Sequence, residues 1–168
     1  MNMVPGNSDV PLTEWMDAMV QALGQVAINP LGYKGSEVLS YPKVIPDGNC
    51  GSYIPLHRNE ESIRLCLLMD QRGRQAIARS LFCMSPGDDD LDEQDVGDAL
   101  GEILNIMSGL IKARIGAKAI EQNQAKAEVK IGLPGYLSNA SSVLTAPEAS
   151  IAKVRIGPVF GLLAITRE

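Results

Sequence analysis

The strongest constraint on the fold comes from residues 95–111, where apolar side chains recur at helical spacing. At about 100° per residue, these side chains fall on one side of a helix. They are Val96, Ala99, Leu100, Ile103, Leu104, Met107, Leu110 and Ile111. An apolar face this wide has to be buried, so the segment predicts a helix that packs against a larger structure.

The opposite side of the same helix has an unusual composition. Asp98, Glu102 and Asn105 stand at positions i, i+4 and i+7, which places them within about 60° of one another. Three glycines lie around them, namely Gly97, Gly101 and Gly109. A helical glycine costs about 1 kcal/mol relative to alanine, and asparagine is also a poor interior helix residue.

Two interpretations of this stripe differ in what they expect of the glycines. On an ordinary solvated face, Lys, Glu and Arg are the usual residues, and the glycines serve no purpose. On a surface that receives a partner, Gly101 and Gly109 would keep bulky side chains away from Glu102 and Asn105. We favour the second interpretation, which makes this stripe the candidate functional site.

Composition argues against several classes of protein. The chain has 168 residues, 45% of them hydrophobic and 21% charged, so we expect one globular domain with residues 1–10 as a loose terminus. A net charge of −5 and only 4% aromatic residues remove the basis for nucleic-acid binding. The apolar run at 159–165 is too short to span a membrane, and the N-terminus lacks signal-peptide features. The isolated Cys50, Cys66 and Cys83 favour a reduced, cytoplasmic setting.

The acidic run at 88–95 could be interpreted as a calcium-binding loop, but it does not fit the EF-hand pattern. An EF-hand needs glycine at the sixth position and glutamate at the twelfth, but Glu93 and Ala99 stand there. Acids at the start of a helix also interact favourably with the helix dipole. His57 is the only histidine, so we expect neither a metal site nor a Ser-His-Asp or Cys-His nucleophile.

Periodicity and turn residues predict an α+β protein, with long helices packed on a mostly antiparallel β-sheet. The expected helices are 13–28, 74–84 and 90 to about 114–118. The expected strands are 36–44, 51–57, 62–69, 126–133, 151–156 and 158–166, with a loop at 134–139. Asp90 is expected to cap the long helix in a capping-box relation with Glu93.

The stripe resembles the motif of the CheC/CheX/FliY phosphatases of bacterial chemotaxis. The matching residues are Asp98, Glu102, Asn105 and Gly109, and Pro134 is the candidate for a proline that the family carries downstream. The spacing to this proline exceeds the family's usual spacing, and residues 121–126 would form the insertion. A pair on the first helix, Glu14 and Asp17, is interpreted as a degenerate or coincidental second copy. With one intact motif in a short chain, the resemblance is nearest to CheX.

The resemblance implies a CheC/CheX-like fold and a phosphatase that hydrolyses the aspartyl phosphate of a CheY-like response-regulator receiver domain. It implies that Asn105 orients the attacking water and that Glu102 pairs with a lysine of the receiver. Asp98, Gly101 and Gly109 would contact this partner. The receiver would supply Mg²⁺, so the chain would need no cofactor of its own, and assembly as a homodimer is expected. The alternatives are a non-catalytic receiver-binding adaptor and a flagellar-switch-type interaction module.

Overall fold

The structure is a computed structural model that describes residues 9–123 and 128–168. Within this part of the chain, seven strands form one sheet in the order β1-β6-β7-β3-β2-β4, with β5 also paired to β2. All of the pairings are antiparallel. The strands are β1 (Ser36–Ser40), β2 (Cys50–Arg58), β3 (Glu61–Met69), β4 (Val129–Ile131), β5 (Gly135–Leu137), β6 (Glu148–Ile156) and β7 (Val159–Arg167). The helices are α1 (Leu12–Ile28), α2 (Gln71–Leu81), α3 (Glu93–Glu121) and α4 (Ser141–Leu144).

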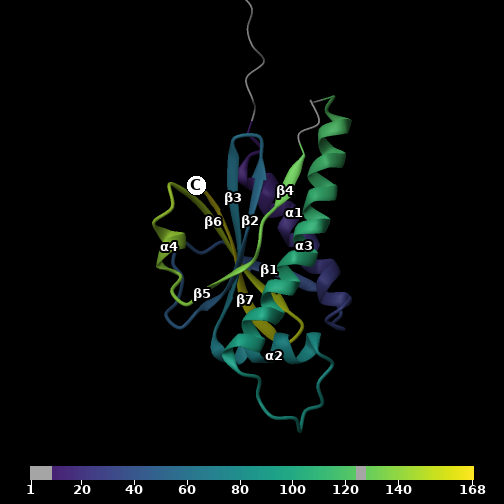
Figure 1. Cartoon of the computed structure of the whole chain (residues 1–168), viewed down its shortest axis with the longest axis vertical. Coiled ribbons are helices and arrows are strands. Elements are labelled where there is room, and N and C mark those ends of the chain that lie inside the picture. Colours follow the sequence, from purple (N-terminus) through teal and green to yellow (C-terminus); the bar gives the residue numbers. More distant parts are fainter. Residues whose placement is uncertain (1–8, 124–127) are drawn as a thin grey trace, which may run out of the picture.

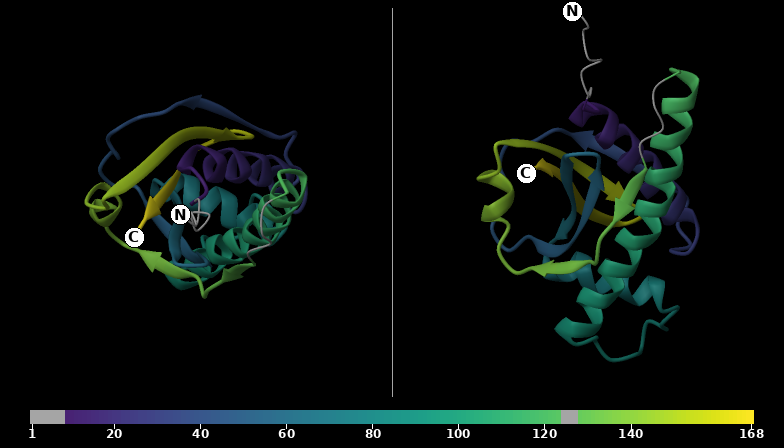
Figure 2. Two further views of the ribbon diagram at one scale, coloured as in Figure 1. Left: turned by 90° about the horizontal axis from the view of Figure 1, so that it is seen from above. Right: turned by 45° about the horizontal axis from the view of Figure 1, so that its top comes forward.

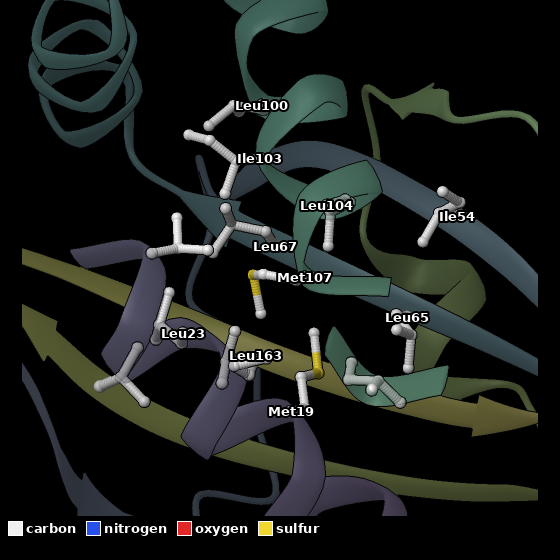
Figure 3. Close-up of a cluster of buried hydrophobic side chains, with 14 of the residues drawn as sticks. Met19, Leu23, Ile54, Leu65, Leu67, Leu100, Ile103, Leu104, Met107 and Leu163 are labelled. Atoms are coloured by element: carbon white, nitrogen blue, oxygen red, sulfur yellow. The ribbon is translucent and has the colours of Figure 1, made fainter. Parts of the chain in front are cut away.

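Three helices cover one face of the sheet, which confirms the expected α+β class (Figure 1). The further views in Figure 2 show α1 and α3 beside each other on this face, where Lys118 Nζ of α3 lies 3.4 Å from Glu14 Oε1 of α1. Figure 3 shows part of the core, in which α1 and α3 meet β2, β3 and β7. Its labelled side chains are Met19, Leu23, Ile54, Leu65, Leu67, Leu100, Ile103, Leu104, Met107 and Leu163. A smaller cluster around Cys66 and Val143 joins α4 to the opposite face.

The long helix α3 has the two faces that its sequence predicts. The residues of the predicted apolar face are buried, with Leu110 half-buried at the edge of the core, whereas Ile120 near the end of the helix is exposed. The helix has 29 residues, which gives it a length of about 43 Å. Because the apolar side is packed against α1 and the sheet, the opposite side is held as a rigid surface.

The starts of α2 and α3 differ from the expected ones because nearby aspartates cap them. Asp70 accepts a 2.7 Å hydrogen bond from the backbone N–H of Gly73, so α2 begins before the expected residue 74. Asp92, rather than Asp90, caps α3 and accepts from the N–H of Asp95 at 2.8 Å. Both bonds satisfy backbone donors that a helix start leaves free.

Three strands also differ from expectation. β1 ends at Ser40, next to a bulge and shortly before Pro42, instead of continuing to Val44. Residues 135–137, expected to be a loop, form β5 and pair with β2. The expected strand 126–133 is reduced to β4 in its described part. Residues 124–127, which include half of the expected insertion 121–126, lie outside the described residues.

None of the helices in the described part of the chain combines the length and the apolar character that crossing a membrane requires.

Candidate functional site

The exposed side of α3 brings the candidate residues together. Asp98, Glu102, Asn105 and Gly109 are all exposed on this helix, whose other side is buried in the core. Among the residues that the structure describes, neither Glu102 nor Asn105 forms a side-chain hydrogen bond or an ion pair. A carboxylate and an amide therefore stand side by side on a rigid helix, with their hydrogen-bonding groups available to a partner.

Gly101 differs from the expectation that it lies open on this stripe. It is buried, and a Cβ at this position would stand 3.3 Å from the Cβ of Pro134. Gly97 is similar, because a Cβ there would be 3.2 Å from the ring of Tyr136. These glycines let the segment around β5 pack directly on the helix. Gly109 does lie open as expected, since a Cβ there would have free space around it.

The approach of β5 to α3 creates a groove of about 450 Å³ beside the stripe. The residues that line it are Ser52, Glu93, Gln94, Gly97, Asp98, Gly101, Glu102, Pro134, Gly135 and Tyr136. The buried Ser52 of β2 donates a 3.1 Å hydrogen bond to the carbonyl oxygen of Gly97 and so ties the sheet to the helix. Asp98 and Glu102 thus lie between the open surface of α3 and the groove, and both line the groove.

Tyr136 forms the β5 wall of this groove. Its hydroxyl donates to Glu93 Oε2 at 3.3 Å and lies 3.3 Å from Cys50 Sγ. Burial raises the pKa of the Tyr136 hydroxyl above its usual range, and the hydrogen bond with Cys50 adds to the rise. A tyrosine hydroxyl is already protonated at neutral pH, and the raised pKa of Tyr136 extends its protonated range to more alkaline pH. Sequence reasoning missed this residue because it assigned Tyr136 to a loop.

The acidic run before α3 has structural contacts. Asp88 accepts a 2.7 Å hydrogen bond from the N–H of Ser85, and Asp90 lies 3.5 Å from Arg79 Nη1. Asp92 is the helix cap described above. In residues 9–123 and 128–168, no group of three or more His, Cys, Asp or Glu side chains could hold a metal ion.

Helix α1 carries Glu14 and Asp17, the pair interpreted from sequence as a degenerate or coincidental second copy of the motif. Glu14 is paired with Lys118 of α3. The spacing of Asp98, Glu102 and Asn105 is also repeated by Asp17, Gln21 and Gly24, and most of the residues between them are buried in both helices. Gln21 and Gly24 replace the carboxylate and the amide, so α1 has the same orientation toward the core without the same chemistry.

The fold and this stripe define an α+β protein of the CheC/CheX type. The family model described as "Chemotaxis phosphatase CheX" matches residues 54–154, which is more than half of the chain and includes the stripe and Pro134. The chain therefore belongs to the CheX family, and the resemblance seen in the sequence is confirmed.

Solved structures of the same type share the fold at low sequence identity. The chemotaxis protein CheX from Vibrio vulnificus has a TM-score of 0.67 and 15% identity, covering 92% of this chain and 99% of that chain. A chain of the CheX–CheY–BeF3–Mg²⁺ complex from Borrelia burgdorferi has a TM-score of 0.65 and 16% identity, covering 94% and 97%. A chemotactic CheC-like protein from Shewanella oneidensis has a TM-score of 0.66 and 16% identity, covering 94% and 100%. Curated proteins give no match to this sequence.

Proposed function

We propose that this protein is a phosphatase that accelerates hydrolysis of the aspartyl phosphate of a CheY-like receiver domain. The observation that carries the proposal is the exposed pair Glu102 and Asn105 on a core-anchored helix of a chain that belongs to the CheX family. The similarity to a chain from a CheX–CheY complex supports a receiver as the partner.

Hydrolysis of an aspartyl phosphate requires the protein mainly to position the attacking water. An aspartyl phosphate is an acyl phosphate with a good leaving group, so catalysis consists mainly of holding a water in line with phosphorus. The amide of Asn105 suits this task because its oxygen accepts from water and its NH₂ donates, without adding negative charge beside the phosphoryl group. The receiver supplies Mg²⁺, which neutralises charge on the phosphoryl oxygens.

The neighbouring residues position this amide. Glu102, one helical turn before Asn105, pairs with a lysine of the receiver, and Asp98 supports the contact at the rim. Gly109 leaves space on the same stripe for the partner to approach, since no described residue outside the adjacent helix backbone lies within 4 Å of its Cβ position. Gly101 acts indirectly, because it allows Pro134 to pack against α3 next to Glu102.

A panel of phosphorylated receiver domains tests the proposal against its two rivals. We expect loss of phosphate from at least one receiver to accelerate when the protein is added, and the acceleration to saturate with protein concentration. A non-catalytic adaptor would bind a receiver without acceleration. A flagellar-switch-type module would bind motor components and leave the receiver's dephosphorylation rate unchanged. Either of these results would refute the phosphatase assignment.

The same proposal includes assembly as a homodimer and action in the cytoplasm. Light scattering coupled to size-exclusion chromatography measures the mass in solution. A mass of one chain of 18.0 kDa, rather than two, would refute the dimer.

A further inference from the structure

The groove between α3 and β5 has two lining residues, Glu93 and Tyr136, to which the proposed function gives no role. Glu93, Asp98 and Glu102 line it together with the ring of Tyr136, whereas Asn105 does not. None of the three carboxylates forms a salt bridge with another residue in the described part of the chain. The groove therefore concentrates negative charge beside an aromatic ring, with no cation among the described residues paired to it.

Tyr136 is held in place rather than free to rotate. Its ring packs on the helix backbone at Gly97, and its hydroxyl is hydrogen-bonded to Glu93 and lies next to Cys50. The residue is still 39% exposed. A fixed, neutral ring is thus offered to whatever enters the groove.

A basic side chain is the occupant that this combination favours. Ring faces attract cations, and a guanidinium can stack on a ring while donating hydrogen bonds to carboxylates. An acidic group would be repelled, and an apolar group would bury carboxylates without partners, which is costly. The carboxylates are also not arranged to hold a metal ion, as far as the described residues show.

We propose that the groove receives a basic side chain of the receiver, in addition to the lysine that pairs with Glu102. This inference rests on the proposed function, since it names a second contact of the same partner. The groove lies to one side of Asn105, so the contact would set which receivers bind and how tightly. It would leave the hydrolysis step itself unchanged.

Steady-state kinetics on two groove variants test the inference. The substrate is the phosphorylated CheY-type receiver that the wild type dephosphorylates most efficiently in the panel above. Glu93→Gln and Tyr136→Leu are each expected to raise KM about tenfold, with kcat nearly unchanged. Tyr136→Phe keeps the ring and is expected to have a smaller effect than Tyr136→Leu. Asp17→Asn is the matched control, because it also removes one exposed helix carboxylate, but on α1.

A charge-reversal experiment separates a direct contact from a structural effect on β5. Glu93→Lys is expected to weaken binding of the BeF3⁻-loaded receiver. Each Arg and Lys on the receiver is then changed to Glu, and one of these changes is expected to restore binding by the Glu93→Lys variant. Restoration by one receiver variant, with no such gain for the wild type, would support the groove contact.

Two outcomes would overturn the inference, and they are distinguishable. An unchanged KM in both Glu93→Gln and Tyr136→Leu would refute the groove contact, and so would a failure of every receiver variant to restore binding by Glu93→Lys. In either case, acceleration of dephosphorylation by the wild-type protein would leave the phosphatase assignment intact. If the wild type accelerates no receiver in the panel, the proposed function itself is wrong, and the groove contact is rejected with it.

Discussion

Two glycines on α3 provide a direct test of how this surface is built. Gly101 and Gly109 occupy the same helix, but a Cβ would meet Pro134 at 3.3 Å at the first position and open space at the second. Alanine at either position gains about 0.5–1 kcal/mol from helix propensity and a less flexible unfolded chain. At Gly101 the contact with Pro134 offsets that gain, because overpacking typically costs about 1 kcal/mol or more.

The two alanine variants are therefore expected to differ in thermal stability. For a protein of this size, Gly109→Ala should raise the Tm by about 1–4 °C. Gly101→Ala should leave the Tm unchanged or lower it. Melting curves followed by circular dichroism measure both values. Equal stabilisation by the two substitutions would refute the packing of Pro134 on Gly101.

The same positions test whether a partner approaches the stripe. Gly109→Leu is expected to reduce the dephosphorylation rate of the receiver at least tenfold while the fold stays intact, since the new side chain would project between the partner and Asn105. Gly116→Leu is the matched control, because Gly116 also has open space and lies two turns farther along α3. Full activity in Gly109→Leu would show that the partner does not approach there.

Three further predictions concern the partner, the core and metals. Glu102→Gln is expected to weaken binding of a BeF3⁻-loaded receiver by about 2–5 kcal/mol, because it removes one side of an interfacial ion pair; unchanged affinity in a titration would place Glu102 outside the interface. Burial raises the pKa of the Cys66 thiol from 9.0 to about 12, so above pH 9 the unfolded chain loses this proton and the folded chain keeps it. Stability should therefore fall by up to about 1.4 kcal/mol per pH unit from pH 9 to 12, and denaturant titrations should show a smaller fall for Cys66→Ala. Purified protein should contain no stoichiometric metal, and EDTA should not shift its Tm; one zinc or calcium per chain in elemental analysis would contradict this.

The long helix was predictable because its signal is local. The apolar residues between Val96 and Ile111 repeat at the helical period and are buried or half-buried, so the side of α3 that faces the core could be assigned from sequence. The antiparallel sheet followed from the alternation of apolar segments and turns. A solvated helix face does not need a Glu and an Asn framed by glycines, which marked the stripe as a candidate site. The family itself was indicated by the resemblance of this motif to that of the CheC/CheX/FliY phosphatases.

The groove was not predictable because it depends on a contact between distant segments. β5 has only three residues, and its pairing with β2 is what brings Tyr136 and Pro134 onto α3. A helical pattern shows which side of α3 is polar, but not that another strand covers part of that side. Gly101 was therefore assigned to open surface.

The most direct test of the phosphatase assignment compares Asn105→Ala with the wild type under single-turnover conditions. The receiver is phosphorylated, the enzyme is added at saturating concentration, and the loss of phosphate is followed. We predict that Asn105→Ala binds the receiver and melts like the wild type but loses about 10²-fold or more of the acceleration, because the attacking water is no longer held. Wild-type turnover by Asn105→Ala would contradict the proposed mechanism.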